Sequence, residues 1–218
     1  MRWLLVLACT GCGRLAFDER EIAVTPDGTP DMMARTCTTL EFDQFPSELT
    51  IVGGTIEIAN GQIRFEIPGD LDSEAYVELT TPISFVGRST AIQAVSPSMT
   101  PSASTGMGWH EQTGQRVGVH LEMDGTNLKL NRYNPAADEY TEFISTSYDA
   151  AAHVWWRLRE ENALIIAEVS TDGVGWDLFG TVAGIDVTSM TWDIGLGAYV
   201  SAIAPSESTA DNAINCVP

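Results

Sequence analysis

Basic residues are scarce in this chain of 218 residues, which has 11 Lys and Arg against 30 Asp and Glu and a net charge of -19. Proteins that bind nucleic acid need a basic surface to neutralise phosphates, so this charge argues against nucleic-acid partners. It also argues against docking on anionic lipid through a basic patch. The chain has no apolar run of about 18 residues, which a membrane-spanning helix requires. A membrane contact therefore has to come from a covalent anchor.

Several motifs of catalytic chemistry are missing as well. No G-x-S-x-G elbow marks a nucleophilic serine. The histidines are His110, His120 and His153, and His110-Glu111 lacks the second His of a zinc-protease helix. Gly106-Met107-Gly108 lacks the third Gly of a phosphate-binding loop. We therefore expect each histidine to be a surface residue or a hydrogen-bonded structural one.

The residues that are present favour an all-β domain. The hydrophobic fraction of 44% and the charged fraction of 19% are sufficient for one domain with a buried core. Apolar and polar residues alternate over residues 55–67, with Asn60-Gly61 in the middle, which is a strong hairpin signal. Further short alternating runs follow, divided by Gly, Asp and Asn. This pattern predicts a two-sheet antiparallel sandwich.

The N-terminus has the features of a short secretory signal: Met1-Arg2, then the apolar run Trp3–Ala8, then small residues and cysteine. Thr10-Gly11-Cys12 resembles a bacterial lipobox, which implies cleavage before Cys12 and lipidation of that residue. Cys9 is the competing acceptor, and an apolar strand or a cleaved soluble leader are the other interpretations.

From the lipobox resemblance we expect a signal peptide over 1–11 and an acidic flexible tether over 12–36. The folded domain then spans 37–218, exported and lipid-anchored to the bacterial cell envelope, at the outer membrane.

Cys37 and Cys216 remain once the leader cysteines are set aside. In an oxidising compartment two such residues most simply pair, and the ends of a domain often lie close together. The sequence predicts a disulfide between them, with two free thiols as the alternative.

The segment His153–Glu168 is ambiguous. Trp155-Trp156-Arg157-Leu158-Arg159 has the propensity for a helix, but it also alternates. In a strand Trp156 and Leu158 face the core, together with Val117, Val119, Leu121, Leu128 and Leu130 of earlier strands. Neighbouring segments all alternate with period two, so we favour the strand.

Ser170-Thr171-Asp172-Gly173-Val174-Gly175-Trp176, with the strand before it, resembles the late hairpins of concanavalin A-like lectin and glucanase domains, including laminin-G-like jelly rolls. The resemblance implies a jelly roll over 37–218. It also implies carbohydrate binding, glycan hydrolysis or cell-surface protein contact, and the fold does not choose among these functions.

A hydrolase of this kind needs two carboxylates that flank the scissile bond. The related glucanases carry them in an E-x-D-x-x-E strand. Glu122-Met123-Asp124 matches the first half of that motif, but Asn127 stands at the last position and Asp124-Gly125 predicts a turn. We therefore expect a domain without catalytic residues.

The alternation of inward and outward residues along the strands also predicts a binding face. Arg116, His120, Tyr133, Trp155 and Arg157 all lie opposite the predicted core positions. Aromatic rings and arginines on an open sheet face suit sugar stacking and hydrogen bonds to hydroxyls. We expect these residues to share one exposed face and to bind a ligand.

No cofactor is expected. A structural calcium ion is an open alternative, with Asp186, Asp193, Asp211 and Asn212 as candidate ligands. The leading hypothesis is a surface lipoprotein whose β-sandwich binds a glycan or another envelope component. A glucanase-type glycoside hydrolase and a protein-adhesion module are the alternatives.

Overall fold

The computed structural model describes residues 36–40, 42–68, 73–100, 103–111, 117–134, 137, 139–198 and 205–217. The predicted signal peptide, the predicted lipidation at Cys12 and nearly all of the predicted tether lie outside the described residues. None of the described residues forms a helix that is long and apolar enough to cross a membrane.

The described residues fold into two antiparallel sheets. One sheet has the strand order β13-β12-β11-β6-β15-β4-β3, with β1 added beside β15. Its strands are β1 (Thr36–Leu40), β3 (Thr55–Ala59), β4 (Gln62–Ile67), β6 (Ser89–Ser96), β11 (Trp155–Glu161), β12 (Leu164–Ser170), β13 (Asp177–Ala183) and β15 (Ser206–Val217). We call it the eight-stranded sheet.

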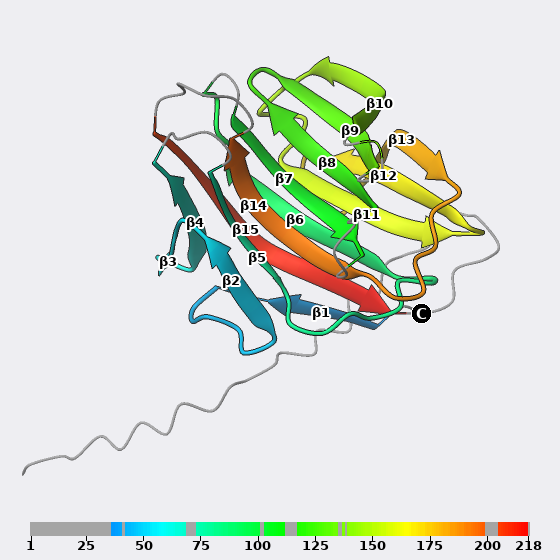
Figure 1. Cartoon of the computed structure of the whole chain (residues 1–218), viewed down its shortest axis with the longest axis horizontal. Helices are drawn as coiled ribbons and strands as arrows, with labels where there is room; N and C mark the ends of the chain where they lie inside the picture. The colour runs from blue at the N-terminus through cyan, green and yellow to red at the C-terminus, as the bar shows by residue number, and fades with distance from the viewer. Residues whose placement is uncertain are drawn as a thin grey trace, which may run out of the picture.

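The other sheet, the seven-stranded sheet, has the order β10-β9-β8-β7-β14-β5-β2. Its strands are β2 (Leu49–Gly53), β5 (Glu74–Leu79), β7 (Ala103–His110), β8 (Gly118–Asp124), β9 (Asn127–Asn134), β10 (Glu139–Ser147) and β14 (Thr191–Ala198). In the view of Figure 1 this sheet lies in front of the eight-stranded sheet. The predicted all-β sandwich is therefore confirmed, and no described residue is helical.

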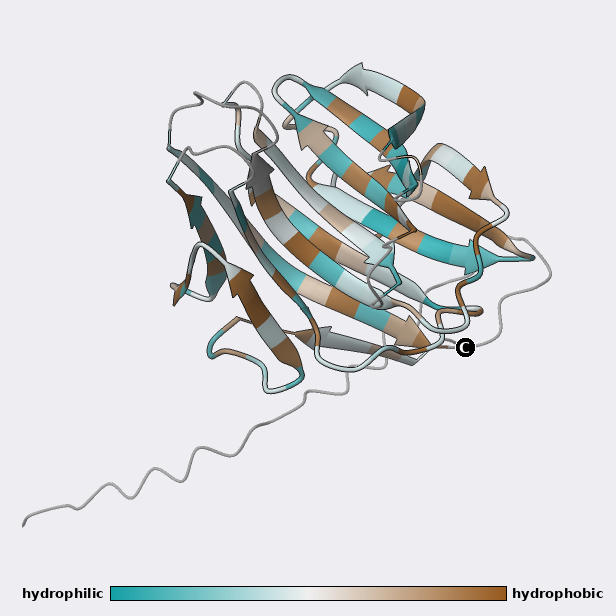
Figure 2. Cartoon of the chain, viewed as in Figure 1, coloured by the Kyte–Doolittle hydropathy of each residue, from teal (hydrophilic) through white to brown (hydrophobic). Residues whose placement is uncertain are grey.

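The two sheets enclose one apolar core. Hydrophobic and hydrophilic residues alternate along most strands (Figure 2), so each strand turns one face to the core and the other outward. Val119, Leu121, Leu128 and Leu130 are all buried, as predicted. Val117 is an exception, because it precedes β8 and is only partly buried.

The ambiguous segment forms the hairpin β11–β12, so the strand prediction is confirmed. Trp156 and Leu158 are 0% exposed, whereas Trp155 and Arg157 remain partly exposed on the opposite side. The indole Nε1 of Trp156 donates a hydrogen bond to the carbonyl oxygen of His153 at 2.9 Å. Burial of the ring therefore leaves its one polar group satisfied.

The Ser170–Trp176 motif builds the turn after β12. Ser170 Oγ accepts hydrogen bonds from the backbone N–H groups of Asp172 and Gly173, and Asp172 Oδ1 accepts them from Val174 and Gly175. These backbone donors, that of Val174 first, hold the pKa of the Asp172 carboxyl below its usual value. Gly173 has a φ of 76°, and a Cβ there would lie 3.0 Å from the Trp155 ring. Only glycine meets both conditions.

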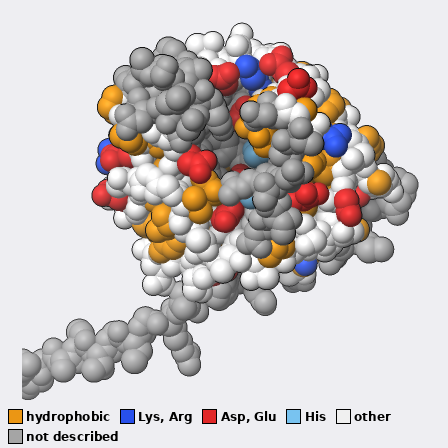
Figure 3. Space-filling view, viewed as in Figure 1, with side chains coloured by type: hydrophobic (Ala, Val, Ile, Leu, Met, Phe, Trp, Pro, Cys, Tyr) orange, Lys and Arg blue, Asp and Glu red, His pale blue; other side chains and the backbone are white. Residues whose placement is uncertain are grey.

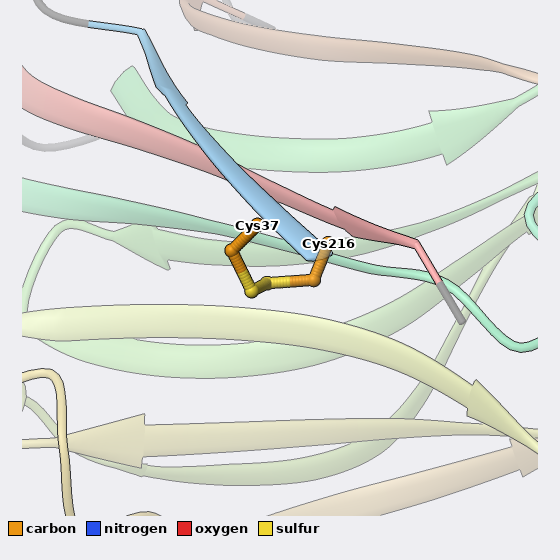
Figure 4. The surroundings of a disulfide bond; sticks show 2 residues. All are labelled: Cys37 and Cys216. Atoms are coloured by element: carbon orange, nitrogen blue, oxygen red, sulfur yellow. A yellow bond between two sulfur atoms is a disulfide. The ribbon is translucent and has the colours of Figure 1, made fainter. Parts of the chain in front are cut away.

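The predicted disulfide between Cys37 and Cys216 is present (Figure 4). The two residues lie opposite each other in the β1–β15 pair. β15 itself lies between β4 and β6 in the interior of the eight-stranded sheet. The bond therefore ties the first described strand to a central strand.

Candidate functional site

The outer side of the seven-stranded sheet carries an unusual concentration of polar residues. Strand register puts the following residues on this side, which we call the polar face: Glu74, Tyr76, Glu78, Ser104, Gly106, Gly108, His110, Gly118, His120, Glu122, Asp124, Lys129, Asn131, Tyr133, Tyr140, Glu142, Asp193 and Gly195. Figure 3 shows histidine side chains inside a hollow on the corresponding side of the molecule, with acidic side chains around it.

Glycine forms the floor at the centre of the polar face. Gly108 on β7 lies between Asp193 on β14 and His120 on β8. A Cβ at Gly108 would lie 2.6 Å from His120 Nδ1 and 3.0 Å from Asp193 Oδ1. Gly106 is the next residue of β7 on this face, and a Cβ there would lie 2.9 Å from Glu122 Cβ. The absence of a Cβ at Gly106 and Gly108 gives the flanking side chains room to approach each other over β7, and Gly108 itself is buried beneath them.

Glu122 is held firmly on one side of this floor. Its side chain is buried, with 9% of the residue exposed. Ser104 Oγ donates to Glu122 Oε2 at 3.2 Å, and Asn131 Nδ2 donates to Glu122 Oε1 at 2.6 Å. Both carboxylate oxygens thus have a neutral donor, which fixes the orientation of the group.

His110, the next residue of β7 on this face after Gly108, lies among oxygen atoms. It is 1% exposed. Its Nε2 is 2.8 Å from Asp193 Oδ2 and 3.7 Å from Glu78 Oε2, and its Nδ1 is 3.1 Å from the carbonyl oxygen of Glu111. The ring is nearly parallel to that of His120, at 6.5 Å between centroids. The site therefore combines carboxylates and imidazoles at one end of the glycine floor.

The β9–β10 side of the polar face supplies aromatic and basic groups. The rings of Tyr133 and Tyr140 are 4.7 Å apart, and Tyr140 is 49% exposed. Lys129 Nζ lies 2.9 Å from Asp124 Oδ2 and 3.6 Å from Glu142 Oε2. The hydrogen bond that Lys129 donates to Asp124, followed by the charges of both carboxylates, raises the pKa of Lys129 above its usual value.

The predicted binding residues do not share one face, so that part of the prediction is wrong. His120 and Tyr133 lie on the polar face of the seven-stranded sheet. Trp155 and Arg157 lie on the outer side of the eight-stranded sheet, because β11 pairs with β6 and β12 rather than with β8 or β9. The alternation of side chains correctly separates the inward from the outward residues of one strand. It does not indicate which sheet the strand joins. Arg116 lies outside the described residues.

Trp155 and Arg157 have partners of their own on that second face. Arg157 Nε donates to Glu168 Oε2 at 2.6 Å, and its guanidinium lies 4.0 Å from the centre of the Trp176 ring. Trp155 packs over Gly173. This second face therefore has a built aromatic cluster, separate from the polar face.

His120 and Tyr133 are the residues of the polar face that the sequence predicted as ligand-binding, and the others, among them Glu78, His110, Asn131 and Asp193, were not predicted. One signal for them is present in the sequence. Gly106 and Gly108 lie at alternate positions of β7, and Gly195 and Gly197 lie at alternate positions of β14, although glycine normally weakens a strand. Glycines in this pattern indicate that other side chains approach the backbone closely, and Asp193 is the direct strand neighbour of Gly108.

The other sequence candidates do not converge on a metal site within the described residues. Asp124 lies at the end of β8 before a turn in which Gly125 has a φ of 63°, and it pairs with Lys129. Asp186 accepts hydrogen bonds from Thr188 instead of joining the other calcium candidates. Over the described ranges, no group of three or more His, Cys, Asp or Glu is arranged to hold a metal ion.

No family model and no curated protein matches the chain, but solved structures do. A prokaryotic β-1,3-1,4-glucanase (lichenase) derived from a mouse hindgut metagenome has a TM-score of 0.60 at 14% identity, covering 84% of this chain and 99% of its own. An endo-β-1,3-glucanase from Pyrococcus furiosus has a TM-score of 0.63 at 10% identity, covering 82% and 92%.

The carbohydrate recognition domain of Emp46p has a TM-score of 0.55 at 10% identity, covering 78% of this chain and 88% of its own. Such low identities show the fold alone. The chain has the jelly-roll fold of the concanavalin A-like glucanases and lectins.

Proposed function

We propose that this domain binds a carbohydrate chain across the polar face without cleaving it. The observation that carries the proposal is the glycine floor of Gly106 and Gly108 between Glu122 and His120 on one side and Asp193 on the other. A sugar ring needs a shallow surface with hydrogen-bonding groups at its edges, and an aromatic ring beside it to stack on. Tyr133 and Tyr140 supply the rings at the β9–β10 side.

The solved structures of the same fold support a carbohydrate ligand. Two of them are described as glucanases and one as a carbohydrate recognition domain. The fold alone does not transfer their activities to this chain. The chemistry of the polar face therefore has to decide between binding and hydrolysis.

Binding without hydrolysis fits the carboxylates. Retaining hydrolysis needs two carboxyl groups about 5–5.5 Å apart, one of which attacks the sugar. Both oxygens of Glu122 accept hydrogen bonds from Ser104 and Asn131. Asp124, two residues further along β8, is paired with Lys129 at the strand end. The carboxylates of Glu122 and Asp124 are thus engaged by groups of the protein itself, which supports binding over hydrolysis.

Tyr133→Ala and His120→Ala should each weaken glycan binding by about 1–3 kcal/mol, the scale measured for stacking of bases on aromatic side chains. The measurement is calorimetric titration of the full-length protein with oligosaccharides that bind on a glycan array. Trp155→Ala is the matched variant on the other sheet. If Trp155→Ala lowers the affinity while Tyr133→Ala does not, binding takes place on the outer side of the eight-stranded sheet.

Product analysis during the same titration separates binding from hydrolysis. An intact oligosaccharide after prolonged incubation is the expected result. New reducing ends that disappear in Glu122→Gln would establish the hydrolase alternative instead.

We propose in addition that the domain is an exported lipoprotein, anchored through Cys12 to the bacterial envelope. The support is the Arg2, apolar run and Gly11-Cys12 order of the leader and the disulfide, which belongs to an oxidising compartment. Mass spectrometry of the membrane fraction should find an N-terminal acylated Cys12. A chain that retains Met1 would contradict this, and acylation of Cys9 would move the anchor.

A further inference from the structure

The polar face is acidic among its described residues. Strand register gives it the following carboxylates: Glu74, Glu78, Glu122, Asp124, Glu142 and Asp193. In the described strands, Lys129 is the one Lys or Arg on this face, and its charge is already shared between Asp124 and Glu142. A ligand on this face therefore meets an excess of negative charge, which repels a polymer of uronic acids and attracts a cation.

The same face contains buried acceptors that lack a donor. Asn131 is 5% exposed, and its Nδ2 is used by Glu122. Its Oδ1 has no hydrogen-bond partner among the described residues, and the same holds for Glu78 Oε2, which lies 3.7 Å from His110 Nε2. A buried acceptor without a donor costs free energy, and a ligand that brings N–H or O–H groups recovers it.

These two observations point to one chemical group. A primary ammonium brings a positive charge and three donors, and it has no acceptor that would compete. Lys129 shows that an ammonium is accommodated here, since its Nζ lies 2.9 Å from Asp124 Oδ2. A metal ion fits less well, because the carboxylates in the described ranges do not converge into a metal site.

We infer that the polar face selects glycans that carry free amines, such as oligomers of glucosamine, over neutral or acidic glycans. The inference rests on the proposed carbohydrate binding and names its ligand class. Strand register places Glu78 four strands away from Asn131, roughly 19 Å at the usual strand spacing. We therefore expect separate amino groups of one oligomer to contact Glu78 on one side of the glycine floor and the Glu122–Asn131 pair on the other.

The test is calorimetric titration of the full-length protein at neutral pH and low salt with three probes of equal length. They are a glucosamine tetramer, its fully N-acetylated counterpart, which has no charge, and the neutral glucose tetramer cellotetraose. We expect the glucosamine tetramer to bind at least tenfold more tightly than the other two. The difference should shrink severalfold in 0.5 M NaCl, where charges are screened.

Two variants localise the effect. Glu78→Gln removes a charge from the polar face and should reduce the preference for the amine at least fivefold. Glu57→Gln removes a charge from β3 on the other sheet, where Glu57 is exposed and pairs in register with Arg64, and should leave the preference unchanged. Equal losses in both variants would mean general attraction to an acidic protein and would overturn the inference.

The remaining outcomes separate the inference from the proposed function. If all three tetramers bind with similar affinity and Tyr133→Ala weakens them, carbohydrate binding stands and amine selectivity is wrong. If calcium at matched ionic strength displaces the glucosamine tetramer, the face is a metal site and the inference is overturned. If none of the tetramers binds and no glycan on an array does, both proposals are wrong.

Discussion

Replacing Trp156 by alanine should lower the free energy of unfolding by about 3–5 kcal/mol, as truncation of a buried aromatic residue does. Trp156 is fully buried in the core on β11, and its Nε1 hydrogen bond to the His153 carbonyl is lost with the ring. The edge of the Tyr148 ring faces it at 6.3 Å between centroids, so the cavity also removes an aromatic contact. Urea unfolding followed by circular dichroism measures the change.

Trp155→Ala is the control, because the two residues are adjacent and chemically identical. Trp155 is only partly buried and packs over Gly173 on the outer surface. We expect its loss to cost clearly less than that of Trp156. A larger loss for Trp155→Ala would mean that β11 faces the opposite way.

Removing the disulfide with the double variant Cys37→Ser, Cys216→Ser should lower the free energy of unfolding by about 4–5 kcal/mol, according to the loop-entropy estimate. The bond joins residues 179 positions apart, so it restricts nearly the whole unfolded domain. The folded domain should keep its two sheets, because β1 still pairs with β15 over Thr36–Leu40. Chemical denaturation with tryptophan fluorescence measures the midpoint and the slope.

The wild-type protein denatured in the presence of a reductant provides the comparison for this variant. It should unfold at the same denaturant concentration as the double variant, because both lack the cross-link. If the double variant is as stable as the oxidised wild type, the bridge does not stabilise the domain and its role lies elsewhere.

Local patterns were enough to predict most of the fold. Period two placed Val119, Leu121, Trp156 and Leu158 in the core, and all four are fully buried. The Asn60-Gly61 turn between β3 and β4 was equally local, and both residues have positive φ values. Each of these features depends on residues within one strand or one hairpin.

Pairing between distant strands could not be predicted in the same way. β11 lies beside β6, and β14 lies between β5 and β7. The packing of the whole chain determines which distant strands pair. The local sequence pattern of a strand does not indicate its partner. This is why Trp155 was assigned to the face of His120, although the two residues belong to different sheets.

The candidate site depends most on such pairing between distant strands, so its composition could not be predicted from local patterns. Glu78, Gly108 and Asp193 come from three strands separated along the chain, and only the register β5–β14–β7 brings them together. The alternating glycines were visible in the sequence, but their neighbours across the sheet were not.

The position of the disulfide also determines how the domain would respond to mechanical tension. A pull on the chain from its N-terminal side enters the described fold at Thr36 and meets Cys37 one residue later. The covalent bond then passes the load to Cys216 on β15, which is held between β4 and β6. The hydrogen bonds of β1 are bypassed, so they cannot be unzipped one at a time. A load applied from the N-terminal side would therefore be borne in shear by an interior strand of the eight-stranded sheet.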